Sequence, residues 1–481
     1  MPGRSGRVAG EVGGGGDTPD GIEISGMEGR PGSSSRSDGF SLVAPVDGDD
    51  EQLVGGGVRG SARGAGAGAG ANDSREHLSS DRRTFVNLLI SFVGAGILGI
   101  PFAYRQGGLL LSTGVLAMVG VVCTYCMWML VRCKYRVIAL RGKDEPGPVK
   151  YPDICHEALG KWGLVAVEGA LVASQSGFST AYLVFIARNL RALFGFRETP
   201  VIFLCVPGLV LMCFIKHLKY LAPFSLIAEV VNLTGLAVVF FDDAEFMGIN
   251  HESISMAHWK AFPFVFGVGV YCFEGMGMVI PIEDAMTNRE NFTPILSVVM
   301  VIYTTLCILS GGLGYLAFGD ETEDIILLNI GSTASTLIVK LSFCVGLYFT
   351  FPIMMVPVWE VLEFKWLRNH SPSYGRDRNM LRAAVVLGTG LLACAIPNFG
   401  LFVSLIGSSC CALLAFILPT LCYTRLETSA GFPLGPVRKF INKLIIAAGV
   451  FAMIYGTADT VVRIAHEYAV GDGGEGGHAR A

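Results

Sequence analysis

The chain has little charge for its length. Of its 481 residues, 16% are Asp, Glu, Lys or Arg, whereas 52% are hydrophobic. A soluble globular protein carries about 25% charged residues, and nucleic-acid-binding proteins usually display a clustered basic patch. The sequence has no such patch, and its formal net charge is −4. The composition therefore excludes an ordinary soluble domain and does not indicate nucleic acid as a partner.

Histidine is scarce and peripheral. The eight histidines fall in the first 83 residues, in loops or near the ends of apolar segments, and none lies deep in such a segment. The polar residues of the apolar segments also form no pair of nucleophile and base. We therefore expect a protein that is not an enzyme and has no catalytic residues. Protons crossing the apolar segments would have to be carried by carboxyl groups.

Cysteine is absent from the loops predicted on the far side of the membrane, which excludes disulfides there. The 13 cysteines lie almost all in or beside apolar segments. Cys123 and Cys126 form a C-x-x-C pair, but inside an apolar helix, where cysteine usually serves as a small packing residue. We expect no metal site.

The first 83 residues lack the apolar content of a folded core. They are rich in Gly and Ser and include the low-complexity run GAGAGAGA at residues 64–71. Such a segment cannot bury enough apolar surface to offset its ordering entropy. We predict a disordered cytoplasmic tail over residues 1–83, which contains no continuous apolar stretch typical of a secretory signal peptide. A transmembrane domain at 84–464 and a short C-terminal tail at 465–481 follow.

Long apolar runs recur from residue 84 onward, each long enough to cross about 30 Å of hydrocarbon. They predict an all-α polytopic membrane protein. The eleven predicted transmembrane helices cover residues 84–105, 107–132, 163–187, 200–215, 220–241, 261–281, 293–318, 333–359, 380–398, 400–422 and 441–464.

Lysine and arginine are unevenly distributed among the predicted loops. If the N-terminus is cytoplasmic, most of them fall on the cytoplasmic side, whereas the acidic runs FDDAEF and GDETED fall on the opposite side. The positive-inside rule therefore predicts a cytoplasmic N-terminus and a C-terminus outside or in a lumen.

Glycines interrupt two of the predicted helices. The first helix contains GAGILG at Gly94–Gly99, and the sixth contains four glycines and Glu274 within residues 264–284. Small residues can simply allow close helix packing. Alternatively, the helix is broken, its free backbone groups line a cavity, and the N-terminus of the half-helix binds a carboxylate.

The position of the two interruptions favours broken helices. They lie in the first and the sixth helix. If five helices form one unit, the odd number of membrane crossings makes the next unit run in the opposite direction, so the second unit is inverted relative to the first. Interrupted helices in corresponding positions of two inverted halves indicate the binding site of a secondary transporter. We therefore predict a 5+5 inverted repeat with one additional helix.

Ionisable residues inside apolar helices are functional candidates. Glu229 and Glu274 are the candidates for proton coupling, because a buried carboxyl group can exchange a proton near neutral pH. Glu274 could instead be structural and bind loosened backbone at the break. Glu168 is expected near the membrane interface, and Lys340 is expected to extend its amine toward it.

Several long motifs, in order, resemble the amino acid/auxin permease family. They include TFVNLLISFVGAGILGIPFAY, SQSGFSTAYLVFIARN, LAPFSLIAEVVNL, GVGVYCFEGMGMVIPIEDAM and LIGSSCCALLAFILP. Within that family the chain looks most like plant vacuolar neutral amino-acid exporters and proton-coupled amino-acid transporters. The resemblance implies a LeuT-like fold and an amino-acid substrate. It implies binding of the substrate by Gly94, Ala95, Gly96, Ile97, Leu98 and Gly99 at the carboxylate, and by the segment of Tyr271, Phe273 and Gly275 at the ammonium and side chain.

One position departs from the family's proton-coupled animal members. Those proteins carry a histidine where this chain has Asn87, which puts coupling through that residue in doubt. The acidic residue Glu229 is shared in type with the plant vacuolar group.

The sequence thus predicts a secondary transporter, a symporter that moves small neutral amino acids from a vacuole or lysosome into the cytosol. The proton gradient would drive it without any cofactor, although sodium coupling stays open. Two alternatives also stay open: a proton symporter of the plasma membrane, and an amino-acid sensor whose N-terminal tail recruits a signalling partner. The expected partners are amino acids and the lipid bilayer, and protein partners and oligomeric state are left open.

Overall fold

The computed structural model describes residues 79–141, 147–215, 235, 254–331, 334–367, 374–396, 398–429, 431 and 434–475. Apart from Gly235, the predicted fifth helix, with Glu229, lies outside the described residues, as do the first 78 residues. All described residues belong to one compact unit, Phe40–Ala481, and the other unit, Met1–Gly39, also lies outside them.

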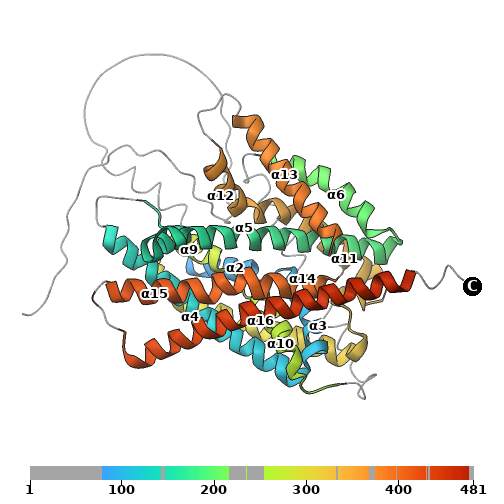
Figure 1. Ribbon diagram of the computed structural model, residues 1–481, viewed down its shortest axis with the longest axis horizontal. Helices are drawn as coiled ribbons and strands as arrows, with labels where there is room; N and C mark the ends of the chain where they lie inside the picture. The colour runs from blue at the N-terminus through green and yellow to red at the C-terminus, as the bar shows by residue number, and fades with distance from the viewer. Residues whose placement is uncertain are drawn as a thin grey trace, which may run out of the picture. The chain divides into compact units, whose positions relative to one another are not determined.

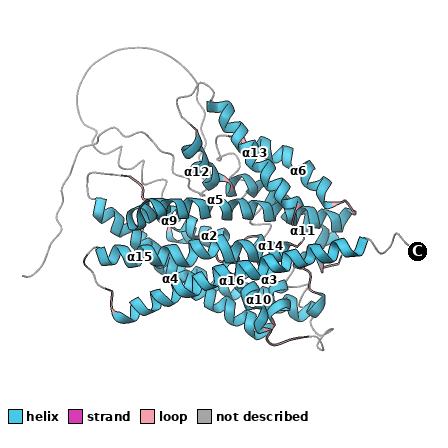
Figure 2. Cartoon of the chain, viewed as in Figure 1, coloured by secondary structure: helices cyan, strands magenta, loops and turns pink. Residues whose placement is uncertain are grey.

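The described secondary structure is helical, apart from one isolated bridge between Ser79 and Met286 (Figure 2). The longer helices are α2 Asp81–Phe92, α3 Ile100–Gly107, α4 Leu109–Arg141, α5 Tyr151–Phe194, α6 Glu198–Cys213, α8 Phe262–Cys272, α9 Met276–Asp284, α10 Phe292–Phe318, α11 Ala334–Met354, α12 Val356–Trp366, α13 Tyr374–Cys394, α14 Phe399–Ile406, α15 Leu418–Ser429 and α16 Pro436–Glu475. Short 3-10 turns are η1 Ala95–Gly99, η4 Trp259–Ala261, η5 Arg289–Asn291, η6 Gly319–Glu321 and η7 Ile326–Leu328. Two π-helical turns, η8 Gly407–Cys411 and η9 Leu413–Ile417, join α14 to α15.

The all-α polytopic architecture is confirmed, whereas the predicted number of eleven transmembrane helices is not. Among the described residues, 7 helices are long and apolar enough to cross a membrane, or 8 if α2 and the bent segment Ala95–Gly107 form one span. Helix α6 is apolar but shorter, and α13 begins with a charged turn. Described helices cover every predicted position except the fifth.

Several helices extend beyond their predicted ends, and α4 and α5 are two of them. Helix α4 continues to Arg141, so Lys134 is a helical residue rather than part of a loop. Helix α5 begins at Tyr151 and bends at Gly160, whose φ of 68° lies in the left-handed region that favours glycine. Hydropathy marks only the part of a helix that faces hydrocarbon, so these extensions carry no apolar signal.

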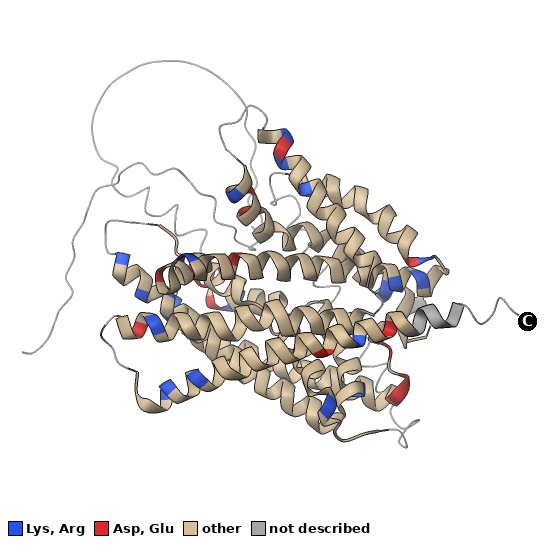
Figure 3. Ribbon diagram, in the orientation of Figure 1, with Lys and Arg blue, Asp and Glu red and all other residues tan. Residues whose placement is uncertain are grey.

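Helix α5 runs through the middle of the helical unit (Figure 1). It packs against α6, α11, α12 and α13 on one side and against α14 and α15 on another. Lys, Arg, Asp and Glu gather toward the ends of the long helices, and the middle is almost free of them (Figure 3). This distribution suits a hydrocarbon layer across the middle, where charged side chains are costly.

Candidate functional site

The first predicted interruption is a break in the helix. Helix α2 ends at Phe92, and Val93 and Gly94 have extended backbone, with ψ of 94° and −173°. The chain then re-enters helical structure as η1 and continues into α3, bent by 43° from α2. The N–H groups at the start of a helix have no partner within it. The break therefore leaves the N–H groups of Gly94–Gly96 without a partner among the described residues, as expected for a broken helix.

The sixth predicted helix is also broken. Helix α8 ends at Cys272, and α9 starts at Met276. Between them, Gly275 has φ −165° and ψ 10°, which is outside the helical region. The residues in this gap are Phe273, Glu274 and Gly275.

The two breaks face one another. A Cβ atom placed on Gly96 would lie 2.9 Å from Cε1 of Tyr271 and 3.1 Å from Sγ of Cys272. A Cβ atom on Gly275 would overlap the ring of Phe92. Glycine is thus required where each half-helix approaches the other. The packing of small residues and the broken helix, which were alternatives from the sequence, occur together here.

Gly94 differs from the other glycines of the breaks. A Cβ atom placed on it would meet nothing within 4 Å. Among the described residues, the space beside Gly94 is therefore open, whereas Ile97 and Leu98 are buried in the core. The free N–H donors at the start of η1 border this open space.

Glu274 is partly buried between the two half-helices. Its Oε1 atom is buried and has no hydrogen-bond partner among the described residues. The N–H of Met276, in the first turn of α9, lies within reach of the carboxyl group. Both predicted roles of Glu274 therefore retain support. The contact with Met276 stabilises the start of α9, which fits a structural role. The unpaired Oε1 fits a role in proton coupling.

Aromatic rings that the sequence analysis did not single out surround the breaks. The ring of Phe178 on α5 stands edge-on to Tyr271, with centroids 4.7 Å apart. Tyr303 on α10 donates a hydrogen bond to the carbonyl of Cys272 (3.0 Å), and its ring lies 5.2 Å from that of Phe273. Phe178 belongs to the SQSGFSTAY motif and Phe92 to the first motif, so the motifs could have indicated them.

Two other ionisable candidates lie away from the breaks. Glu168 pairs with Lys365 of α12 at 2.9 Å. Lys340 extends to the carbonyl of Ile330 in the preceding loop, at 2.9 Å, as expected for an amine reaching toward the helix end.

Buried ion pairs hold the elements that flank the breaks. At the end of α9, Lys134 of α4 binds Glu283 and also Asp284, the latter at 2.5 Å. Beyond α3, Asp324 binds Arg188 of α5 at 2.5 Å and accepts the N–H of Phe399, at the start of α14, at 2.7 Å.

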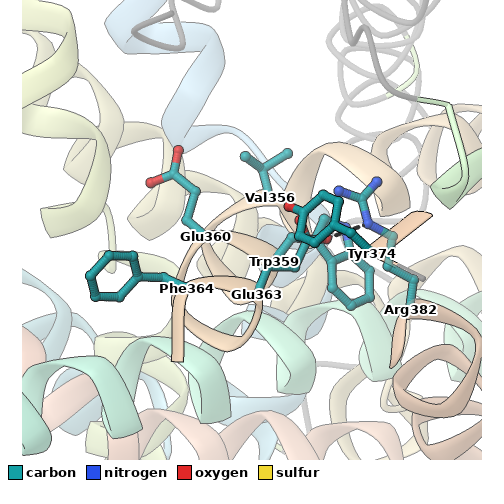
Figure 4. Close-up of a pocket in the computed structure, with 7 residues that line it drawn as sticks. All are labelled: Val356, Trp359, Glu360, Glu363, Phe364, Tyr374 and Arg382. Atoms are coloured by element: carbon teal, nitrogen blue, oxygen red, sulfur yellow. Dashed lines mark hydrogen bonds and ion pairs between the residues drawn. The ribbon is translucent and has the colours of Figure 1, made fainter. Parts of the chain in front are cut away.

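A cavity of about 250 Å³ opens between α12 and α13 (Figure 4). Arg382 binds Glu363 there at 2.6 Å and lies over the ring of Trp359, 5.5 Å from its centroid. None of the residues that line this cavity is a predicted site residue, and the structure gives it no contact with the helix breaks.

The predicted substrate-site residues lie in the two broken segments: Gly94, Ala95, Gly96, Ile97, Leu98 and Gly99 in the first, and Tyr271, Phe273 and Gly275 in the second. Of these, Gly96 lies against Tyr271. Glu274 lies among them, whereas Glu229 lies outside the described residues. No cluster of His, Cys, Asp or Glu suited to a metal occurs in the described part of the chain.

The chain is similar to known transporters over most of its length. Residues 77–462 match the family described as "Transmembrane amino acid transporter protein". "Amino acid transporter ANT1" of Arabidopsis thaliana is 34% identical over 407 residues, which cover 80% of this chain and 93% of the relative. "Vacuolar amino acid transporter 4" of Saccharomyces cerevisiae is 27% identical, covering 81% and 59%. "Proton-coupled amino acid transporter-like protein pathetic" of Drosophila melanogaster is 27% identical, covering 82% and 87%.

The fold also has a counterpart among solved structures. The chain aligns with a structure described as "Inward facing conformation of Mhp1" with a TM-score of 0.55. The alignment covers 82% of this chain and 92% of that one at 11% identity, so it bears on the fold alone. It confirms the predicted LeuT-like architecture. With the matches in sequence, it shows that the chain is a multi-pass membrane protein that belongs to the transmembrane amino acid transporter family.

Proposed function

We propose that the chain carries small neutral amino acids, together with protons, from an acidic compartment into the cytosol. The observation that carries this proposal is the meeting of the two helix breaks, where Gly96 lies against Tyr271 and Cys272. Unwound backbone inside a membrane is tolerated where it lines a cavity or is buried in protein. Two such segments in contact are typical of a transporter's substrate site.

In this proposal, the substrate carboxylate binds the free N–H groups at Gly94–Gly96. The partial positive charge at the start of the helix that runs from η1 into α3 favours an anion there. The open space beside Gly94 provides room for it. The ammonium and side chain then face the segment from Tyr271 to Gly275, whose carbonyl groups end α8.

The residues of the breaks favour a small neutral substrate. The described segments Phe92–Gly99 and Tyr271–Met276 contain one carboxyl group, Glu274, and no lysine or arginine. A second substrate carboxylate would have no cation to bind. Tyr271 and Phe92 fill the space beside Gly96 and Gly275, which favours a substrate with a small side chain.

Glu274 is our candidate for proton coupling among the described residues. Burying a charged carboxylate whose Oε1 has no partner among the described residues is costly, so the closed site favours its protonated form. When the site opens to water, the charged form becomes accessible and the proton can leave. Glu229 is the second candidate, on sequence grounds alone.

The names of the relatives support the compartment and the driving force. One is named as a vacuolar transporter and another as a proton-coupled one. A vacuole or lysosome is acidic, so a proton symporter in its membrane moves substrate into the cytosol.

The test is uptake of radiolabelled alanine into proteoliposomes in sodium-free buffer. We expect accumulation only when an inward proton gradient is imposed. Uptake that requires sodium would overturn proton coupling, and absence of uptake for all neutral amino acids by folded protein would overturn the proposed substrate class.

A further inference from the structure

A second cavity, of about 440 Å³, lies between α3, α14 and α16 and does not include the helix breaks. Its lining combines charged side chains of both signs from α16 with an apolar wall from α3 and α14. We call it the outer cavity. The volume of a drug-sized ligand pocket is about 300–1,000 Å³, so the outer cavity has room for an amino acid and several waters.

Arg463 presents a fixed cationic group to the outer cavity. Its Nε donates to Asp459, one turn earlier on α16, at 2.8 Å. Its guanidinium lies over the buried ring of Phe264, 5.7 Å from the centroid. These two contacts fix the guanidinium plane, and in the described part of the chain its Nη groups have no hydrogen-bond partner. A planar guanidinium edge of this kind binds a carboxylate with two parallel hydrogen bonds.

Glu467 provides an opposite charge one turn further along α16. Residues four apart lie on the same face of a helix, and both Glu467 and Arg463 line the outer cavity. Glu467 is exposed, and no hydrogen bond to it is found among the described residues. Its carboxylate is therefore available to an ammonium group. Gln106, at the end of α3, adds an amide that can donate and accept.

The apolar wall connects the outer cavity to the elements of the central site. Phe102 belongs to the same bent segment as Gly94–Gly99 and packs edge-on against Phe264, with centroids 5.8 Å apart. It also packs against Gly400, where a Cβ atom would lie 2.6 Å from Cδ1 of the Phe102 ring. Glu467 is close enough to Arg188 and Asp324 to interact with them electrostatically. The outer cavity therefore lies near the ion pair of Arg188 and Asp324, which holds the elements beyond α3.

We propose that the outer cavity is a second binding site for a small zwitterionic amino acid, with Arg463 binding the carboxylate and Glu467 the ammonium. The charges, the apolar wall and the volume match such a ligand, and a ligand in this place would contact α3 and α14 before reaching the breaks. The proposal rests on amino-acid transport as the function of the chain.

Equilibrium binding of radiolabelled alanine to the purified full-length chain tests this proposal by counting sites. We expect two bound molecules per chain, and one in the variant Gly96→Val, which blocks the central site. Arg463→Gln should also leave one. Glu467→Gln should weaken the alanine affinity of one of the two sites at least about tenfold. Glu467 has no hydrogen bond among the described residues, so this variant loses none on folding. The matched control is Arg191→Gln, an exposed arginine paired with Glu198 at 2.8 Å, which should retain two.

The second site is overturned if the chain binds one alanine, Gly96→Val abolishes this binding, and Arg463→Gln and Glu467→Gln do not affect it. This result would leave the proposed function intact. Absence of alanine binding by folded wild-type protein would instead overturn the proposed substrate. Thermal unfolding of each variant separates loss of binding from loss of folding.

Discussion

At the residue scale, the central site depends on glycines at contacts and on one carboxyl group without a full set of partners. Gly96 and Gly275 each leave the room that a ring of the opposite segment occupies. Glu274 lies between these contacts with Oε1 unpaired among the described residues. Backbone donors would therefore bind the substrate, while a single side chain would handle the proton.

Replacing Glu274 with glutamine separates these two roles. Glutamine keeps the shape and an acceptor oxygen for Met276, but it cannot release a proton. We expect accumulation driven by a proton gradient to fall at least about tenfold, while exchange of labelled for unlabelled alanine stays within about twofold. Both are measured in proteoliposomes.

The matched control is Glu168→Gln, whose carboxylate pairs with Lys365 away from the breaks. Full gradient-driven accumulation by Glu274→Gln would contradict its role. If Glu229→Gln loses accumulation in the same experiment, the proton role passes to Glu229.

At the element scale, the half-helices beside the site are held at their outer ends by buried ion pairs. Lys134 is 1% exposed and Glu283 is 0% exposed. Together with Asp284 they join α9 to α4. A buried charge that loses its partner is strongly destabilising, whereas removal of the whole pair can be nearly neutral.

Lys134→Met should therefore lower the free energy of unfolding by about 3–5 kcal/mol, because it leaves Glu283 buried without a cation. The double variant Lys134→Met/Glu283→Gln should recover a large part of this loss. Thermal unfolding in detergent measures both. Lys365→Met removes an exposed pair and should cost at most about 1 kcal/mol; an equal loss in both single variants would show that burial of the pair is unimportant.

The sequence predicted the elements better than their contacts. Hydropathy located the helices, and clustered glycines located both breaks, because these signals are local. The extension of α4 to Arg141 was missed, since it leaves the apolar zone. Phe92, Phe178 and Tyr303 were missed as site residues because their role arises from the approach of segments far apart in the chain. The pairing of Lys134 with Glu283 was missed for the same reason.

At the scale of the whole molecule, the first described residues are attached to the transporter domain. The N–H of Ser79 donates to the carbonyl of Ala285 at 2.7 Å, and its carbonyl accepts the N–H of Thr287 at 3.1 Å. Asn291 also donates to the carboxylate of Asp81 at 2.7 Å. The boundary between tail and domain therefore matters for any truncation.

Deletion of residues 1–77 should leave alanine uptake within about twofold of the full chain, because it retains these hydrogen bonds. Deletion of residues 1–80 removes those of Ser79 and should lower stability by about 1 kcal/mol for each bond lost. Uptake and thermal unfolding of both truncations check this. Loss of uptake in the shorter deletion would give the tail a role in transport and favour regulation through it.

The most direct test of the account is alanine uptake by Gly96→Val compared with Gly114→Val. A Cβ atom at Gly96 would meet Tyr271 and Cys272, whereas one at Gly114 would meet nothing within 4 Å. If the opposed breaks form the substrate site, uptake driven by a proton gradient falls to the level of empty liposomes for Gly96→Val and stays near wild type for Gly114→Val. Equal uptake by both variants, folded and inserted to the same extent, would contradict the placement of the substrate between the two breaks.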